Sequence, residues 1–152
     1  MTPFTVRQKQ ESRGSLVVSL IRYIEIELPN HTFRLLKRTS TSFGYLVDGK
    51  AATGSYRDSL AEISFVGNLL QFTTKFGLRI TWDGNHRIDV SLCSSYSRHV
   101  CGLCGNADGN APNDFVDRDN KPVNVSVGDH NTKFFSWGRG WGTFDDAPDA
   151  EA

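Results

Sequence analysis

The chain has 152 residues, enough for one domain of ordinary size with its own hydrophobic core. Its 17 lysine and arginine residues balance 17 aspartate and glutamate residues, so the charge gives no reason to expect a nucleic-acid partner. The longest apolar run, residues 16–20, is far shorter than the roughly 20 residues that cross a bilayer. We therefore expect a soluble protein without membrane insertion.

Most of the chain has the pattern of β-strands. From residue 4 to residue 92 apolar and polar residues alternate with a period of two, and β-branched and aromatic residues are frequent. The predicted strands cover residues 4–10, 16–28, 32–37, 44–47, 62–66, 69–75, 78–82 and 87–92. Because helix signals are nearly absent, this pattern predicts an all-β fold.

The second predicted strand contains one conflict. Its core face should carry Leu20, Ile24, Ile26 and Leu28, but the same alternation places Arg22 on that face. A β-bulge or a shift of register near Arg22 would remove the conflict.

Two Asp-Gly pairs predict hairpin turns, because glycine and aspartate accept the positive φ angles of tight turns. The stronger signal is Asp83-Gly84-Asn85, between the strands at 78–82 and 86–90. The weaker one is Asp48-Gly49, which follows the strand at 44–47.

The character of the chain changes after residue 92. Residues 93–131 carry all three cysteines and many Gly, Asn and Asp residues, which predicts a loop-rich, cross-linked lobe packed on the sheets. Residues 134–144 are strongly aromatic and are expected to pack in a core. Residues 145–152 form an acidic tail that we expect to be disordered.

The cysteines and two sequons bear on the location of the protein. Cys93, Cys101 and Cys104 are disulfide candidates, but three cysteines cannot all pair within one chain. The first residues also lack the pattern of a secretory signal. Both observations are explained if the chain is part of a longer secreted precursor. Asn30 and Asn124 begin Asn-x-Ser/Thr sequons and are candidate glycosylation sites outside the cell.

Cys101 and Cys104 form a Cys-x-x-Cys motif, which can be a redox dithiol, half a zinc site or a pair of disulfide ends. Zinc would need two further ligands, and the candidates Cys93, His86, His99 and His130 provide no second paired spacing. A thioredoxin-type dithiol would need a βαβ context, which the pattern of this chain does not predict.

A run of oxygen-bearing side chains follows the second cysteine of the motif. It is interrupted by Gly109, and its members are Asn106, Asp108, Asn110, Asn113 and Asp114. Hard oxygen ligands on a glycine-containing loop suit calcium. An EF-hand is excluded because no glutamate closes the loop and no helices flank it. The residues alone leave two readings open, a calcium site and a turn whose side chains cap their own backbone.

The whole segment resembles the signature of von Willebrand factor type D domains. The matching sequence is Val100-Cys-Gly-Leu-Cys-Gly-Asn-x-Asp-Gly-x-x-x-Asn-Asp-Phe115. The order of the surrounding features is also similar: the segment 77–84, then Ser-Ser-Tyr96, then the tryptophan-containing segment 134–141. The resemblance covers residues 4–144, which we take as one domain that is partial at its N-terminus, followed by the tail at 145–152.

The resemblance implies a secreted, disulfide-linked β-sandwich of antiparallel strands with a Cys/Asn/Asp-rich calcium-binding lobe. Such domains occur in adhesive glycoproteins, gel-forming mucins, extracellular-matrix proteins and yolk lipoproteins, and are not conventional enzymes. It also implies a structural calcium ion held by the five oxygen-bearing residues, with Asn110 contributing its backbone carbonyl. The chain departs from the family by lacking a Gly-Asp-Pro-His segment and further cysteines, so an early aspartate ligand and the usual partners of Cys101 and Cys104 are missing.

We therefore expect an extracellular adhesion or multimer-assembly module whose partners are other extracellular proteins or further copies of itself. The alternative is an oxidoreductase-like disulfide exchange at Cys101 and Cys104. A hydrolase is not supported, since the sequence contains neither Gly-x-Ser-x-Gly nor His-Glu-x-x-His.

Overall fold

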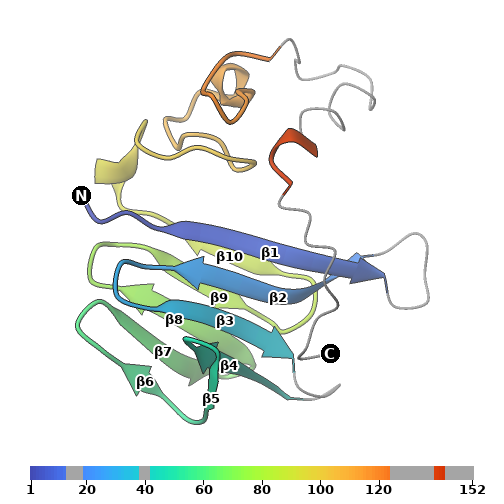
Figure 1. Ribbon diagram of the computed structural model, residues 1–152, viewed down its shortest axis with the longest axis vertical. Coiled ribbons are helices and arrows are strands. Elements are labelled where there is room, and N and C mark those ends of the chain that lie inside the picture. The colour runs from blue at the N-terminus through green and yellow to red at the C-terminus, as the bar shows by residue number, and fades with distance from the viewer. Residues whose placement is uncertain (13–18, 38–41, 124–138, 143–152) are drawn as a thin grey trace. The chain divides into compact units, whose positions relative to one another are not determined.

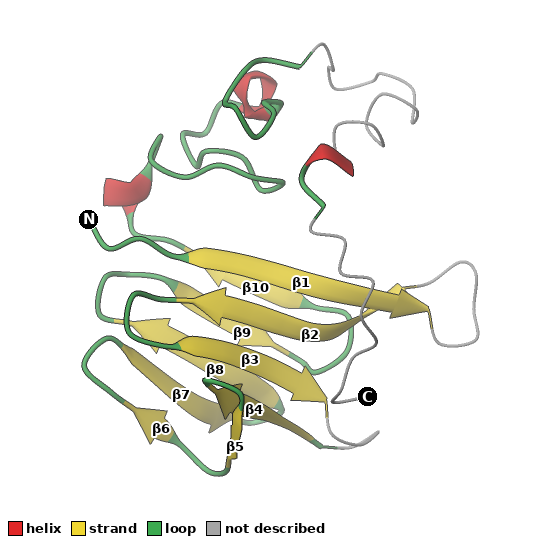
Figure 2. Cartoon of the chain, in the orientation of Figure 1, coloured by secondary structure: helices red, strands yellow, loops and turns green. Residues whose placement is uncertain are grey.

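The chain forms two compact units, residues 1–93 and residues 94–152. The computed structural model describes residues 1–12, 19–37, 42–123 and 139–142. In this described part the strands lie in the first unit. The second contains loops, the short helices η1 (Ser94–Tyr96) and η2 (Ala111–Asp114), and a helical turn at residues 139–140 (Figure 2). The division coincides with the change of composition after residue 92. No helix of the described part is long and apolar enough to span a membrane.

The first unit is a sandwich of two antiparallel sheets with five strands each (Figure 1). One sheet has its strands in chain order: β1 (Thr5–Ser12), β2 (Ser19–Glu27), β3 (Thr32–Lys37), β4 (Phe43–Val47) and β5 (Lys50–Ala52). The other runs from β10 to β6: β10 (Ile88–Ser91), β9 (Arg79–Trp82), β8 (Leu69–Thr74), β7 (Ala61–Val66) and β6 (Tyr56–Arg57). The predicted all-β fold is therefore confirmed.

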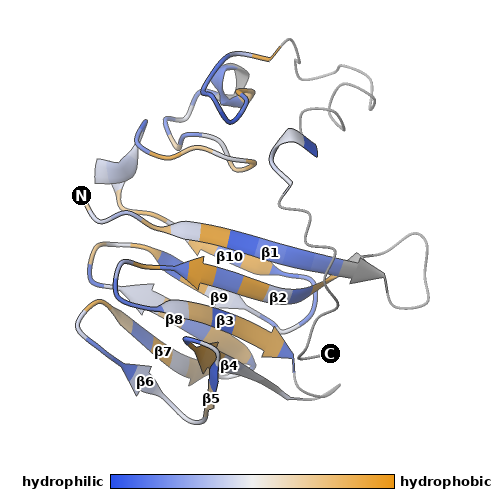
Figure 3. Ribbon diagram, in the orientation of Figure 1, coloured by the Kyte–Doolittle hydropathy of each residue, from blue (hydrophilic) through white to orange (hydrophobic). Residues whose placement is uncertain are grey.

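The core lies between the two sheets and is built from apolar residues of the alternating pattern. Figure 3 shows hydrophobic and hydrophilic positions following one another along the strands. From the β1–β5 sheet Ile24, Ile26 and Phe33 are fully buried, and from the β6–β10 sheet so are Phe72 and Trp82. The rings of Phe33 and Phe72 meet across the interface edge to face, with centroids 5.1 Å apart. The sequence alternation thus becomes two apolar faces that bury each other.

A β-bulge removes the conflict at Arg22. Lys9 of β1 pairs with Tyr23 and the next residue, Gln10, pairs with Ile21, so Arg22 is the extra residue on β2. The bulge changes which side of β2 faces inward. Ile21 is therefore buried although the alternation placed it on the opposite face. The predicted bulge is confirmed, and the predicted core face of β2 is wrong on the N-terminal side of it.

Both predicted Asp-Gly turns connect strands. Asp48 and Gly49 have φ angles of 51° and 82° and form a two-residue turn between Val47 and Lys50. After β9, the Asp83 carboxylate accepts hydrogen bonds from three successive backbone N–H groups, those of residues 85, 86 and 87. These bonds hold residues 83–87 as a loop, which explains why β10 begins at Ile88.

The sequence pattern does not predict β5 or β6. They contain three and two residues, and a strand of that length is too short to display alternation. Part of the predicted aromatic segment, residues 134–138 and 143–144, and the acidic tail at 145–152 lie outside the described residues.

Candidate functional site

All five predicted ligand residues lie in one short segment of the second unit, a loop that leads into η2, and Asp108 lies at its centre. The Asp108 carboxylate accepts hydrogen bonds from the backbone N–H of Asn110 at 2.9 Å and from the side-chain amide of Asn113 at 2.7 Å. The amide of Asn106 approaches the same carboxylate at 3.4 Å. The structure therefore brings together side chains that the sequence only places in a row.

Asp114 closes the loop against Gly105. One oxygen of its carboxylate accepts the backbone N–H of Asn106 at 3.1 Å. Gly105 has a φ of +80°, and a Cβ at this position would lie 2.4 Å from that same oxygen. Only glycine permits both this backbone conformation and the close approach of Asp114.

The Asp108 side chain is 3 % exposed, although the loop lies at the surface. The hydrogen bonds from Asn113 and from the backbone N–H of Asn110 hold the pKa of Asp108 below its ordinary value. The carboxylate is therefore charged at neutral pH and is surrounded by groups that favour its charge.

Arg98 is a neighbour of this site that the sequence did not identify. Its Nε lies 3.9 Å from the Asp108 carboxylate, and its backbone N–H donates to the carbonyl of Asn106 at 2.8 Å. Arg98 has a φ of 67°, which is uncommon for a residue with a side chain. Nothing in its spacing from the motif indicates this contact, because it depends on how the loop folds back.

The donor set fits calcium in chemistry. Asp108 and Asp114 supply carboxylate oxygens, and the amide of Asn113 presents oxygen instead of nitrogen after a rotation of about 180°. The amide oxygen of Asn106 already accepts the backbone N–H of Asp108 at 3.2 Å. Among the residues that the structure describes, no three His, Cys, Asp or Glu side chains form a metal-binding group. A calcium site with two carboxylates would belong in the weak range of calcium affinities, with Kd about 10⁻⁴–10⁻³ M.

The cysteines are exposed. Cys101 and Cys104 lie in the second unit. Cys93 is the last residue of the first unit, where its backbone N–H donates to the carbonyl of Gly77 at 3.0 Å. A Cβ on Gly77 would lie 2.4 Å from the Cβ of Cys93, so these two segments are in close contact. Their role as disulfide ends stays a prediction.

The two sequons differ in what the structure describes of them. Asn30 is exposed in the turn between β2 and β3, so this asparagine is accessible for the attachment of a glycan. Asn124 lies outside the described residues.

Trp141 is the aromatic residue of this segment that the structure describes, and it is half-buried. Its indole N–H donates to the carbonyl of Val116 at 2.9 Å. The Arg118 guanidinium donates to the carbonyls of Gly140, Trp141 and Gly142. These bonds attach residues 116–118 to residues 140–142 within the second unit.

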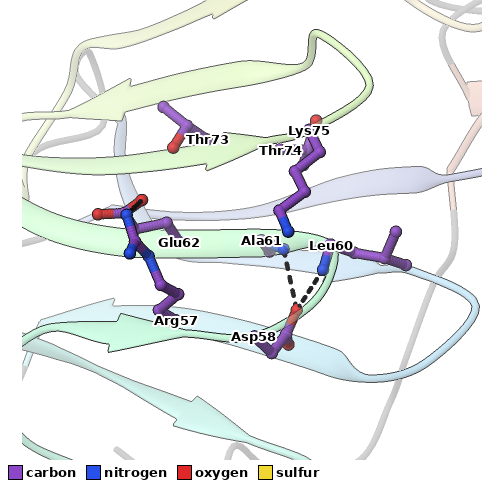
Figure 4. Close-up of a pocket in the computed structure, with 8 residues that line it drawn as sticks. All are labelled: Arg57, Asp58, Leu60, Ala61, Glu62, Thr73, Thr74 and Lys75. Carbon is purple, nitrogen blue, oxygen red and sulfur yellow. Dashed lines mark hydrogen bonds and ion pairs between the residues drawn. The ribbon is translucent and has the colours of Figure 1, made fainter.

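A cavity of about 360 Å³ lies at one end of the β6–β8 strands in the first unit (Figure 4). Its charged lining residues balance, with Arg57 and Lys75 opposite in sign to Asp58 and Glu62. Arg57 is paired with Glu62 at 3.2 Å. The Asp58 carboxylate accepts two backbone N–H groups of the following turn. Three of these four side chains thus have roles in the fold, and the cavity is a weaker candidate site than the Asp108 loop.

Comparison with known proteins identifies relatives of the chain. The model of the von Willebrand factor type D domain matches residues 2–121. Human zonadhesin is 37 % identical over 121 residues, or 79 % of this chain. Human IgGFc-binding protein is 35 % identical over 76 % of the chain, and mouse alpha-tectorin is 30 % identical over 79 %.

The relatives are much longer than this chain. The matched region is 4 % of human zonadhesin, 2 % of IgGFc-binding protein and 6 % of mouse alpha-tectorin. The similarity therefore concerns one module of each relative. Since the family model matches most of the chain, including the Cys-x-x-Cys motif and the Asp108 loop, the chain belongs to the von Willebrand factor type D domain family.

Proposed function

We propose that the chain is a structural module of an extracellular adhesive or multimerising protein, and that calcium bound at residues 106–114 holds its second unit in one shape. The convergence of three asparagines on the nearly buried Asp108 carboxylate is the observation that carries the calcium assignment. The similarity to zonadhesin and alpha-tectorin supports an extracellular location. Its partners would be other extracellular proteins or further copies of itself, and no catalytic step is required.

Calcium, when bound, supplies a divalent charge that attracts both carboxylates. The residues of the chain would position the oxygen ligands. The side chains of Asn106 and Asn113 would hold the ion together with Asp108 and Asp114, and Gly105 leaves room for the Asp114 carboxylate. Because the unfolded loop cannot assemble these oxygens, binding stabilises the folded form by mass action.

Calcium is expected to raise the Tm of the full chain. At about 10 mM calcium the free ion exceeds the expected Kd by about 10-fold to 100-fold, which corresponds to a rise of about 3–10 °C. Asp108→Ala should abolish the rise, because it removes the carboxylate on which the other groups converge. The measurement is thermal unfolding with calcium and with a chelator.

Two variants sharpen this experiment. Asp119→Ala, at an exposed position in the same unit, should keep the full calcium response. Arg98→Gln removes the cation 3.9 Å from Asp108 and should tighten calcium binding by about twofold to fivefold. A wild-type melting curve that calcium leaves unmoved would refute the calcium assignment.

A second candidate function, disulfide exchange, is favoured by the exposure of both Cys101 and Cys104. An exchanging pair should react with a disulfide probe much faster than the exposed Cys93 does near neutral pH. The structural function predicts that Cys101 and Cys104 react with the probe no faster than Cys93 does. The rate at which the probe modifies Cys93→Ser and Cys104→Ser, measured by mass spectrometry, separates the two functions.

A further inference from the structure

The sequon at Asn30 lies at the tip of the β2–β3 hairpin in the first unit. The backbone N–H of Leu28 donates to the carbonyl of His31 at 3.0 Å and closes the turn. Pro29 and Asn30 lie between these two residues and are exposed, whereas Leu28 is buried. The fold therefore presents the asparagine of the sequon at the surface.

The side chain of Asn30 makes a hydrogen bond that a glycan does not have to break. Its partner is the carboxylate of Asp58, which follows β6 of the other sheet. A carboxylate only accepts, so the amide nitrogen of Asn30 is the donor. This nitrogen carries two hydrogens, and an N-linked sugar replaces one of them. The hydrogen that is left can still donate to Asp58.

The turn that carries Asn30 adjoins two other turns. Asp48, in the β4–β5 turn, accepts the backbone N–H of Thr32 at 2.8 Å and lies 2.5 Å from Nδ1 of His31. Asp58, in the β6–β7 turn, lies 3.9 Å from Nε2 of the same ring. We use the term turn end for the turns at residues 28–31, 48–49 and 58–60.

The turn end has the surface of a solvated face. Protein interfaces are anchored by large apolar and aromatic side chains in their centre. Among the residues that the structure describes, none of the exposed large apolar side chains belongs to the turn end: they are Met1, Phe65, Val66, Leu69, Val90 and Leu103. The groups exposed at the turn end include Asn30 and the Asp48 side chain, which is 51 % exposed. Such a surface suits a layer of sugar and water better than a protein partner.

We propose that Asn30 carries an N-linked glycan and that this glycan covers the turn end, so that protein partners bind other faces of the first unit. The proposal rests on the extracellular location in the proposed function, because such glycans are attached to chains on the secretory route. A bond forms between the side-chain nitrogen of Asn30 and C1 of the first sugar of a lipid diphosphate-linked oligosaccharide. The bond from C1 to the diphosphate oxygen breaks, the lipid diphosphate leaves with the electron pair, and the nitrogen loses one proton. The hydroxyl of Thr32 completes the sequence that this transfer requires.

The first test measures the modification itself. The full chain is secreted from cultured animal cells with an added signal peptide, and its tryptic peptide 23–34, which contains Asn30 but not Asn124, is analysed by mass spectrometry. This peptide should carry an oligosaccharide that an amidase specific for N-linked glycans removes. Thr32→Ala should lose the glycan and Thr32→Ser should keep it, although both variants lack the same methyl group. A secreted wild-type chain whose peptide 23–34 is unmodified overturns the proposal.

The second test measures whether the glycan covers the turn end. Lys50 and Arg87 are both exposed and each follows an Asp-Gly turn, but they lie at opposite ends of the sandwich. Lys50 directly follows the β4–β5 turn, whereas the loop before Arg87 is bonded through the carbonyl of Asn85 to the N–H of Ile21, near the start of β2. Trypsin should cleave the folded glycosylated chain after Lys50 more slowly than it cleaves Thr32→Ala, and the two chains should be cleaved after Arg87 at the same rate. Equal rates after Lys50, or the same slowing at both positions, contradict the proposed cover.

Two controls keep the tests specific. Asn30→Gln removes the sequon at its other residue and takes the place of Thr32→Ala if that variant does not fold. The calcium-dependent rise in Tm is measured separately on the same secreted chain. An unmodified Asn30 in a chain whose Tm still rises with calcium overturns the glycan proposal alone, and a glycosylated chain that does not respond to calcium overturns the calcium assignment alone.

Discussion

Replacing Phe72 with alanine is expected to lower the free energy of unfolding of the first unit by about 3–5 kcal/mol. Phe72 is fully buried between the two sheets, and its ring centroid lies 5.1 Å from that of Phe33 on the opposite sheet. Removal of the ring leaves a cavity at the centre of the sandwich, where neighbouring strands are held by their ladders and cannot close it. Urea denaturation followed by circular dichroism measures the loss.

Phe65→Ala is the matched control for this prediction. Phe65 lies on β7, which pairs with the strand that carries Phe72, but its side chain is 44 % exposed near the end of the hairpin. Its removal should therefore cost less than about 1 kcal/mol. Equal losses for the two variants would mean that the core does not lie between the sheets as described.

Gly105→Ala is expected to destabilise the second unit by about 3–4 kcal/mol and to abolish the calcium response. The first part of the cost comes from the φ of +80° at position 105, because residues with a side chain rarely adopt this backbone conformation. The second is a contact of 2.4 Å between the new Cβ and the Asp114 carboxylate. Asp114 must move away, which breaks its hydrogen bond with the N–H of Asn106.

Gly109→Ala separates these two costs. Gly109 lies in the same loop with the same φ of +80°, but no heavy atom lies within 4 Å of a Cβ at that position. The variant should lose about 1–2 kcal/mol from backbone strain and keep most of its calcium affinity. Thermal unfolding and calcium titration of Gly105→Ala and Gly109→Ala show whether the calcium response depends on the position of Asp114 or only on the backbone conformation of the loop. Similar losses of calcium affinity in both would contradict the proposed role of Asp114.

The features that could be predicted from the sequence are local. Alternation identified eight of the strands because each displays its pattern within a few residues. The Asp-Gly pairs indicated turns at Asp48 and Asp83 because the preference for positive φ belongs to those residues themselves. The oxygen-bearing side chains of the candidate calcium loop were identified for the same reason, since all five lie between residues 106 and 114.

The features that could not be predicted depend on contacts between distant segments. The sequence indicated a bulge near Arg22, but its exact pairing follows from the register of β2 against β1. Arg98 approaches Asp108 only because the chain folds back between them. The central role of Asp108 is another such feature, since five similar side chains gave no reason to rank one above the others.

The sequence by itself determined the all-β fold, the family and the residues of the candidate calcium loop, because strand alternation, turn chemistry and motif spacing are properties of short segments. Only the tertiary structure decided which of these segments meet. His31, Asp48 and Asp58 lie on three separate turns, and they come together because two sheets pack face to face and place those turns side by side. A charge relationship of this kind arises from strand pairing and packing, which no local pattern encodes.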